Sequence, residues 1–439
     1  MHIHILGIAG QGMTTPLAVE LKRLGHHVTG SDQQRIYPPA STIIKKAAIP
    51  INQTPITQQI DLAIVGSSYK SFPKSIYEFE QIQKLAIPYI SATKFISQNL
   101  VKPQSILIAG SFGKTTITGL ISWIMFKAGY KPSFMFGGKA INRIPSLHID
   151  TSSWSVIEAD ESINGLDTKA KFLYYQPKYV VLTSASWEHK DSYSSERENL
   201  QAFAKLLQNI PQDGLLVYNP KDSSIKKILK FCQAKSVPYG QNFKFTTSLL
   251  GQHNHENILA AYTLCHQIGI NSKTITESIK SFRGVHRRLE IVSQTHDITI
   301  VDDFAQSPQR IKSAVDTISQ SFPASTIRVY FEPHASFLQT KSSLTGLGQA
   351  LKPADDIIIG QLKFRSQQSK SNRVTARDYI TEIGPKTRYL PLNTDIQNYF
   401  ASHLKPGDIL LHFSSGGLEG LNNLKKIIRL LKTHVQIHH

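Results

Sequence analysis

A glycine-rich turn in the first third of the chain constrains the fold more than any other segment. It follows the apolar stretch 105–109, reads Gly110-Ser111-Phe112-Gly113-Lys114-Thr115-Thr116, and precedes a helical run at 117–128. Backbone amides of such a turn cradle phosphates, its lysine neutralises the β and γ oxygens, and a threonine hydroxyl holds Mg²⁺. We therefore expect a nucleotide-binding α/β unit here. A glycine turn that only caps a helix is the alternative.

The length of 439 residues suggests about three such units. The strand pattern restarts near 101–103 and again near 283–285, which predicts domains at 1–100, 101–283 and 284–439. Predicted strands lie at 2–6, 27–30, 61–65, 105–109, 155–158, 179–183, 298–301, 327–331, 356–359 and 409–413. Their alternation with helix-length stretches predicts an α/β protein with an N-terminal Rossmann-like domain, a central phosphate-loop ATPase-like domain with a mostly parallel sheet, and a C-terminal Rossmann-like domain.

Composition is typical of a globular protein from a reducing compartment. The two cysteines, Cys232 and Cys265, exclude a disulfide framework and a four-cysteine metal site. The sequence contains no apolar run of about 18 residues and no basic leader followed by an apolar segment. We therefore expect a cytoplasmic protein without membrane insertion.

The chain is strongly basic, because 49 Lys and Arg residues outnumber 31 Asp and Glu residues and give a net charge of +18. Such an excess can serve nucleic acid, an anionic membrane surface, or small polyanions such as ATP and nucleotide sugars. The lysines are scattered along the whole chain instead of gathered in one stripe with aromatic residues. We therefore expect no nucleic-acid partner, and solvated surface charge is the plain alternative.

Polar clusters follow two predicted strands of the central domain. Glu158, Asp160 and Glu161 close the strand 155–158, and three carboxylates at a strand end repel one another unless a cation lies among them. His189 lies between acids in the segment 187–191, just beyond the strand 179–183, and we interpret it as a metal ligand although a single histidine is often structural. A further polar segment, 251–257, precedes a predicted helix at 258–268 and can also act as a helix cap.

The N-terminal strands end in small and polar residues. Gly7, Gly10 and Gly12 follow the first strand, and Ser31-Asp32 follow the second. Open α/β sheets bind ligands at the carboxyl ends of their strands, so these residues are candidates for a binding site. The glycine spacing departs from GxGxxG, and close packing is the alternative explanation.

Taken in order, these segments resemble those of the Mur ligase family. That family carries a GxxGKTT loop, an EADES-like segment, a D-H-x-D segment, a GxHNxxN segment, an Arg-Arg pair and a DDYAHHP-like segment. This chain shows residues 110–116, 158–162, 188–191, 251–257, 287–288 and 302–308 at the corresponding places. The resemblance spans essentially the whole chain. It implies an ATP-dependent carboxylate–amine ligase that uses Mg²⁺ and acts on UDP-N-acetylmuramate in cell-wall synthesis or recycling.

The resemblance also implies roles for single residues. The ATP loop comprises Gly110, Ser111, Gly113, Lys114, Thr115 and Thr116, and the catalytic residues are Lys114, Glu161, His189 and Arg288. The metal ligands are Thr115, Glu161 and His189. His253 and Asn257 contact adenine, Arg288 contacts the phosphates, and Asp303 contacts the nucleotide from the last domain. Gly10, Gly12, Ser31 and Asp32 line a uridine-diphosphate pocket. Because the nucleotide contacts lie on two domains, domain closure is expected.

Two segments favour the branch of the family that joins a recovered peptide, L-Ala-γ-D-Glu-meso-diaminopimelate, to UDP-N-acetylmuramate. Residues 36–42 look like the YPP-x-ST segment of that branch, and residues 413–420 are similar to its SNGGFGG segment. A branch that adds L-alanine shares the ATP apparatus and is the first alternative.

Three departures from the family pattern leave further alternatives open. Phe112 and Gln306-Ser307 stand where the family has histidines, and Glu188 replaces an aspartate. If those histidines shape the amine-acceptor site, the acceptor or the rate differs here. A nucleotide-binding homologue that has lost ligation, an unrelated phosphate-loop ATPase and a polyanion binder therefore stay as alternatives. We expect a monomer or a weak homo-oligomer.

Overall fold

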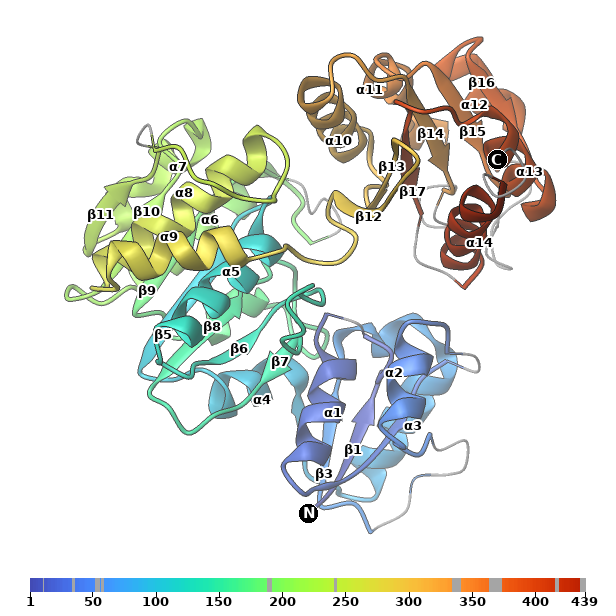
Figure 1. The fold of residues 1–439 in the computed structure, drawn as a ribbon. Coiled ribbons are helices and arrows are strands. Elements are labelled where there is room, and N and C mark those ends of the chain that lie inside the picture. The colour runs from blue at the N-terminus through green and yellow to red at the C-terminus, as the bar shows by residue number, and fades with distance from the viewer. Residues whose placement is uncertain are drawn as a thin grey trace. The chain divides into compact units, whose positions relative to one another are not determined.

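The computed structural model describes residues 1–10, 12–33, 36–51, 56, 59–187, 192–240, 243–333, 341–362, 373–414 and 418–434. These described residues form three β-sheets, each accompanied by helices (Figure 1). The chain divides into two compact units, one of residues 1–249 and 253–285, and the other of residues 250–252 and 286–439. The first unit holds two of the sheets. The predicted three-domain α/β class is confirmed, and the boundaries at 100/101 and 283/284 stay predictions.

The first sheet is parallel throughout, with the strand order β2-β1-β3-β4. Ile3 and Ile5 on one face of β1 pack against Leu17 and Leu21 of α1. Because the strand side chains alternate, His4 and Leu6 lie on the other face. The elements are β1 (His2–Leu6), α1 (Thr14–Arg23), β2 (His27–Ser31), α2 (Ala40–Lys46), β3 (Leu62–Val65), α3 (Pro73–Lys84), β4 (Tyr89–Ser91) and α4 (Ala92–Asn99).

The second sheet has the order β11-β10-β9-β5-β8-β6-β7 and is parallel except for the pair β6–β7. Its central strands are apolar on both faces, as a parallel sheet covered by helices on both sides requires. The strands are β5 (Gln104–Ala109), β6 (Ser133–Met135), β7 (Leu147–His148), β8 (Trp154–Glu158), β9 (Tyr179–Leu182), β10 (Leu215–Tyr218) and β11 (Lys235–Pro238). The helices are α5 (Lys114–Lys127), α6 (Glu196–Gln208), α7 (Ser223–Ile228), α8 (Gln252–Gln267) and α9 (Ser272–Ser281).

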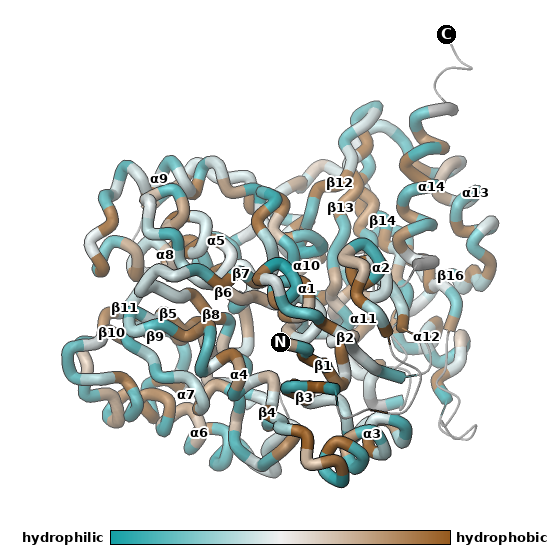
Figure 2. The backbone as a smooth tube through the Cα atoms, turned by 90° about the horizontal axis from the view of Figure 1, so that it is seen from below, coloured by the Kyte–Doolittle hydropathy of each residue, from teal (hydrophilic) through white to brown (hydrophobic). Residues whose placement is uncertain are grey.

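The third sheet has the order β12-β13-β17-β14-β15-β16, and only β12 runs antiparallel to its neighbour. The strands are β12 (Glu290–Thr295), β13 (Ile298–Asp303), β14 (Ile327–Phe331), β15 (Asp356–Ile359), β16 (Thr387–Tyr389) and β17 (Ile409–Phe413). The helices are α10 (Pro308–Ser321), α11 (Leu347–Leu351), α12 (Ala376–Ile383), α13 (Asn393–His403) and α14 (Leu418–His434). Leu424, Ile427 and Leu431 form the buried stripe of α14, and Figure 2 shows hydrophobic and hydrophilic residues alternating along this helix.

Every predicted strand exists, with ends that differ by at most two residues. Two predicted helices begin earlier than expected. Helix α5 starts at Lys114, and α8 starts at Gln252, so the prediction that the polar segment 251–257 precedes its helix is wrong. Nearly all of that segment forms the first turns of α8, where its side chains occupy fixed positions around the helix axis.

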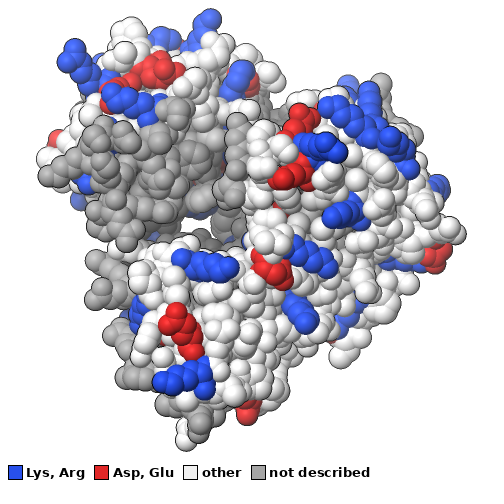
Figure 3. All heavy atoms as spheres, turned by 180° about the vertical axis from the view of Figure 1, so that it is seen from behind, with Lys and Arg blue, Asp and Glu red and all other residues white. Residues whose placement is uncertain are grey.

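On the face shown in Figure 3, the lysines and arginines of the described residues are dispersed and alternate with carboxylates. On this face the distribution is typical of solvated surface charge. The absence of a nucleic-acid partner stays a prediction. Within the described ranges, no helix is long and apolar enough to cross a membrane.

Candidate active site

The turn between β5 and α5 has a backbone shape that only glycine adopts easily. Gly110 has φ +117°, and Gly113 has φ +77° at the position before the helix. A Cβ atom at Gly110 would lie 2.4 Å from Thr183 Oγ1, and one at Gly113 would lie 2.2 Å from Asn257 Oδ1. Both glycines are therefore required by neighbouring elements as well as by the turn.

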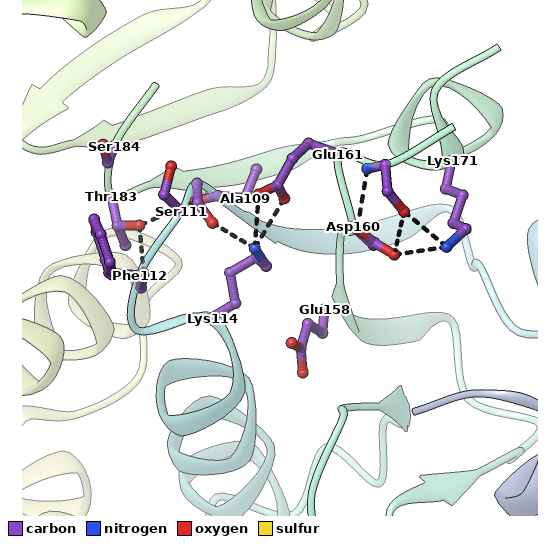
Figure 4. A network of polar contacts seen from close by, with 12 residues as sticks. Ala109, Ser111, Phe112, Lys114, Glu158, Asp160, Glu161, Lys171, Thr183 and Ser184 are labelled. Atoms are coloured by element: carbon purple, nitrogen blue, oxygen red, sulfur yellow. Dashed lines mark hydrogen bonds and ion pairs between the residues drawn. The ribbon is translucent and has the colours of Figure 1, made fainter. Parts of the chain in front are cut away.

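Side chains near the end of the neighbouring strand β9 hold this turn. The Thr183 hydroxyl donates a hydrogen bond to the carbonyl of Phe112 at 2.6 Å, and the Ser111 hydroxyl donates to the carbonyl of Ser186 at 3.0 Å. The side chain of Phe112 itself stays exposed, with 43% of its surface accessible. The turn is thus fixed through the Ser111 side chain and the Phe112 backbone, and not through the Phe112 side chain, as Figure 4 shows for Thr183 and Phe112.

Lys114 spans the turn from the first residue of α5. Its ammonium nitrogen lies 2.6 Å from the Gly110 carbonyl oxygen and 2.8 Å from Glu161 Oε2 (Figure 4). The side chains are 13% exposed for Lys114 and 3% exposed for Glu161. A buried, paired cation therefore lies across the loop where the γ-phosphate of a nucleotide is expected.

The three carboxylates at the end of β8 and just beyond it, Glu158, Asp160 and Glu161, have different partners. Glu158 accepts hydrogen bonds from Thr115 Oγ1 at 3.0 Å and from the Gly137 amide at 2.6 Å, and Glu161 pairs with Lys114. The third carboxylate, Asp160, lies 2.8 Å from Lys171 Nζ and also accepts the amide and hydroxyl of Ser162. Burial alone would raise the pKa of Asp160, but Lys171 and the Ser162 amide hold it well below its usual range.

The oxygen ligands beside the loop fit Mg²⁺, which prefers carboxylates and hydroxyls. The Thr115 hydroxyl and the Glu158 carboxylate are in contact, which makes Glu158 a candidate ligand that the sequence-based set of Thr115, Glu161 and His189 omitted. His189 lies outside the described residues, within which no group of three or more His, Cys, Asp and Glu side chains is placed to hold a metal ion. The described residue Tyr193 donates its hydroxyl to the carbonyl of Glu161.

Helix α8 brings one of the two predicted adenine contacts to the loop. Asn257 is buried, lies against Gly113, and donates to Asn254 Oδ1 at 3.1 Å. His253 lies one turn earlier, and burial lowers its pKa, so the imidazole is neutral at pH 7. A neutral imidazole can donate and accept hydrogen bonds, as recognition of a base requires. The adenine contacts of these two residues stay a prediction.

The residues predicted to line a uridine-diphosphate pocket meet at the carboxyl edge of the first sheet. Asp32 accepts the amide of Ala9 at 2.8 Å, and the carbonyl of Ser31 accepts the amides of Gly7 and Ile8. The Gly10 amide donates to the hydroxyl of Thr14 at 3.1 Å. The glycine turn is therefore tied to the end of β2. Gly12 approaches the central sheet, where a Cβ at this position would lie 3.9 Å from Gly137 Cα.

The residues predicted to reach the nucleotide from the last domain lie in the second compact unit. Both oxygens of Asp303 accept backbone amides, from Leu289 and from Ala305, each at 2.7 Å. Burial raises the pKa of Asp303, while the nearby Arg288 opposes that shift. In the structure this carboxylate holds the backbone at the end of β13, and its nucleotide contact stays a prediction.

The other arginine of the pair, Arg287, is anchored inside the second unit. Its Nε donates to Asp302 Oδ2 at 3.1 Å, and its Nη2 donates to the Ser414 hydroxyl at 3.0 Å. The opposite oxygen of Asp302 lies 2.7 Å from Nδ1 of the fully buried His412. Burial alone would raise the pKa of Asp302, but His412 and Arg287 hold it below its usual range. Sequence reasoning did not identify this network, because its members are up to 127 residues apart.

The residues that depart from the family pattern, and the two segments that favour the peptide-joining branch, are described in part. Gln306 is buried and lies 3.4 Å from the carbonyl of Glu332, and Ser307 precedes α10. Tyr37, at the start of the 36–42 segment, is 54% exposed. Residues 415–417 of the late segment and Glu188 lie outside the described residues.

The fold and the site together define a three-domain α/β protein with a phosphate loop in its central domain. Three family models match the chain in order: "Mur ligase family, catalytic domain" at residues 2–101, "Mur ligase middle domain" at 108–242, and "Mur ligase, glutamate ligase domain" at 287–416. The chain belongs to the Mur ligase family, whose members are ATP-dependent ligases that form amide bonds.

Individual relatives carry two different activities in their names. A UDP-N-acetylmuramate–L-alanine ligase of Desulfitobacterium hafniense is 27% identical, with 95% of this chain and 98% of that protein covered. A UDP-N-acetylmuramate–L-alanyl-γ-D-glutamyl-meso-2,6-diaminoheptandioate ligase of Escherichia coli is 28% identical, with 96% and 97% covered. The solved structure of a UDP-N-acetylmuramate–alanine ligase from Thermotoga maritima has the same fold, with a TM-score of 0.76, 20% identity and 99% of both chains covered.

Proposed function

We propose that this chain uses ATP to join the peptide L-Ala-γ-D-Glu-meso-diaminopimelate to the lactyl carboxylate of UDP-N-acetylmuramate. The observation that carries the proposal is the meeting of Lys114, Thr115, Glu158 and Glu161 at the carboxyl edge of the central sheet. These side chains supply the cation, the hydroxyl and the carboxylates that a Mg²⁺-ATP site needs.

The proposed reaction has two steps. The lactyl carboxylate attacks the γ-phosphorus of ATP, which yields an acyl phosphate and ADP. The α-amine of the peptide then attacks the acyl carbon, phosphate leaves, and the amine loses a proton. Two anions must approach each other in the first step, so the work of the protein is mainly electrostatic.

Each residue has a defined task in this proposal. Lys114 would offset the negative charge of the transferred phosphoryl group, and Glu161 keeps the ammonium group above the loop. Thr115, Glu161 and His189 would hold Mg²⁺, with Glu158, which contacts Thr115, as a further ligand, and the ion would neutralise phosphate oxygens. Arg288, from the last domain, would contact the phosphates.

The peptide acceptor is supported by the segments 36–42 and 413–420, which look like those of the peptide-adding branch. The L-alanine-adding activity is the second candidate, and the name of the Desulfitobacterium hafniense relative favours it. Identities of 27% and 28% to the two kinds of relative are too similar to separate the acceptors.

The acceptor assay tests the proposal. Purified protein receives ATP, Mg²⁺ and UDP-N-acetylmuramate with either the tripeptide or L-alanine, and phosphate release and product mass are followed. Product with the tripeptide supports the proposal, whereas product with L-alanine alone identifies the second candidate. Binding of ATP and the UDP-sugar without any product indicates a homologue that has lost ligation. The Lys114→Ala variant serves as the negative control.

We further propose that the reaction takes place in the cytoplasm, where ATP and UDP-sugars are available, and that the protein is a monomer or a weak homo-oligomer. Light scattering at several concentrations tests the oligomeric state. The nucleotide contacts assigned to two domains imply closure, and compaction on adding ATP and UDP-N-acetylmuramate is measurable by small-angle scattering.

A further inference from the structure

A buried glutamate on the first helix of the N-terminal domain binds the central domain. Glu20 of α1 is 4% exposed, although a carboxylate is rarely buried without several partners. It accepts two hydrogen bonds from Arg23, each at 2.7 Å, and one from the Ile149 amide at 2.6 Å. His148 Nδ1 lies 3.1 Å from the same carboxylate. Burial alone would raise the pKa of Glu20, but these partners lower it to about 2.

The partners of Glu20 lie on α1 and at the end of β7. Arg23 lies on the same helix and also donates to the carbonyl of Ile149 at 3.1 Å. His148 ends β7, the edge strand of the central sheet, and Ile149 follows it. We name Glu20, Arg23, His148 and Ile149 the α1–β7 clasp. The clasp therefore ties the helix that follows the Gly7–Gly12 turn to the edge of the ATP-binding sheet.

The other end of the β6–β7 hairpin reaches the candidate metal site. His148 pairs with Phe134 in β6, and the chain continues from β6 to Gly137. The Gly137 amide donates to Glu158 at 2.6 Å, and Glu158 contacts Thr115. One short hairpin thus joins the clasp to the residues that would hold Mg²⁺.

The same hairpin lies beside the glycine turn of the N-terminal domain, where Gly12 approaches Gly137. If the proposed function is correct, the UDP-sugar is held at that glycine turn and its carboxylate must meet the γ-phosphate above Lys114. Misplacement of reacting groups by about 1 Å can cost roughly a hundredfold in rate. The relative position of the glycine turn and Glu158 is therefore a property that the enzyme must control.

We propose that Glu20 is a positioning residue, which sets the placement of the UDP-sugar turn relative to the phosphoryl-transfer site through the α1–β7 clasp. Glu20 lies on the side of α1 that faces β7 and acts through His148, Ile149 and the hairpin. This inference rests on the proposed function for its catalytic consequence. The structural part of the inference, the coupling of Glu20 to Gly137, is independent of the proposed function.

The kinetic test compares Glu20→Gln, His148→Gln and wild type. We expect the rate of amide formation to fall about tenfold in Glu20→Gln, because the two substrates meet less often in the reactive geometry. The Kd values of ATP and of UDP-N-acetylmuramate measured separately stay within about twofold, and phosphate release exceeds amide formation. His148→Gln, a change at a side chain that is 30% exposed, shows the same pattern more weakly.

Glu196→Gln is the matched control, since Glu196 forms an exposed ion pair with Lys227 on the same unit and has side-chain exposure of 53%. We expect it to leave the rate of amide formation, both Kd values and the ratio of phosphate to amide unchanged. A purely structural role of Glu20 would reduce the amount of folded protein and leave the ratio of phosphate to amide at one. That result, or wild-type rates in both clasp variants, overturns the proposal.

Hydrogen exchange separates this inference from the proposed function, because it needs no turnover. In Glu20→Gln we expect the amides of Ile149 and of Gly137 to exchange at least about tenfold faster than in wild type. Faster exchange at Ile149 alone would mean that the clasp is a local contact and would refute the positioning role. Absence of amide product from wild-type protein would instead refute the proposed function.

Discussion

The pairing of Lys114 with Glu161 predicts that stability and turnover respond differently to the same substitutions. Removing one partner of a buried ion pair costs roughly 3–5 kcal/mol, because the other charge stays buried without compensation. The Lys114 side chain is 13% exposed, so we expect a value near the lower end for Lys114→Met, about 3 kcal/mol. Because the unfolding entropy is about 2.1 cal/mol/K per residue, this loss corresponds to a fall in melting temperature of roughly 5 °C for the large compact unit that contains the pair.

The double variant Lys114→Met with Glu161→Gln removes both charges. Replacing both partners by groups of similar shape is often close to neutral, so we expect most of the lost stability to return. Phosphate release stays abolished in both variants, because no cation faces the nucleotide. Thermal unfolding by circular dichroism and a phosphate-release assay measure the two effects on the same samples.

The exposed ion pair of Lys227 with Glu196 provides the control for the Lys114 and Glu161 variants. Its side chains are 58% and 53% exposed, and such pairs contribute about 0–1 kcal/mol. Lys227→Met should therefore leave both melting temperature and turnover near the wild-type values. An unchanged melting temperature in Lys114→Met, or a double variant less stable than both single variants, would refute the reasoning.

Glu158→Gln should raise the Mg²⁺ concentration needed for half-maximal phosphate release by at least about tenfold, and an unchanged Mg²⁺ titration would contradict the ligand assignment. Gly113→Ala should abolish nucleotide binding in calorimetry, because its methyl group meets Asn257 Oδ1, and adding Asn257→Ala should restore folding stability in part. Hydrogen bonding to Glu20 raises the pKa of His148, Asp150 adds to this shift, and Arg23 opposes it. The interaction of protonated His148 with Glu20 therefore stabilises the fold fully at acidic pH, and this stabilisation is lost as the pH rises through the raised pKa. Urea unfolding of wild type and His148→Gln should therefore converge at alkaline pH. Asp302 has a lowered pKa, so the stability gap between wild type and Asp302→Asn should shrink as pH falls below the ordinary aspartate range.

The strands and the phosphate loop were predictable because their signals are local. An apolar strand, two glycines at fixed positions and the Gly-Lys-Thr sequence all lie within the short stretch from Gln104 to Thr116. The short strands β6 and β7 were missed, since segments of three and two residues carry no periodic pattern. The start of helix α8 was predicted too far along the sequence, because the first turns of this helix are polar and resemble a helix cap.

The roles of the acidic residues were only partly predictable. Glu158 is the last residue of β8 and pairs in register with Ile108, which places it beside the loop. Glu161 lies three residues beyond the strand, and the path of the chain there is set by contacts with Lys114 and Tyr193. Lys171, which balances Asp160, carried no local signal, because the pairing depends on a return of the chain 11 residues later.

The clasp illustrates the same limit for a buried charge. Glu20 belongs to an amphipathic helix, and a charged residue in such a helix is expected to face solvent. Its partners His148 and Ile149 lie about 130 residues away in the sequence. Only the docking of α1 against β7 makes this glutamate an interior residue. Charged residues that serve contacts between domains are therefore hard to recognise from one sequence.

The hydrogen bond from Thr183 to the carbonyl of Phe112 has a consequence for how this family can diversify. Because the loop is shaped by its glycines and by backbone contacts, the identity of the exposed side chain at position 112 is decoupled from the integrity of the loop. The side chain at position 112 can therefore change without rebuilding the cradle. The same freedom makes position 112 a suitable attachment point for a fluorescent label in studies of nucleotide exchange.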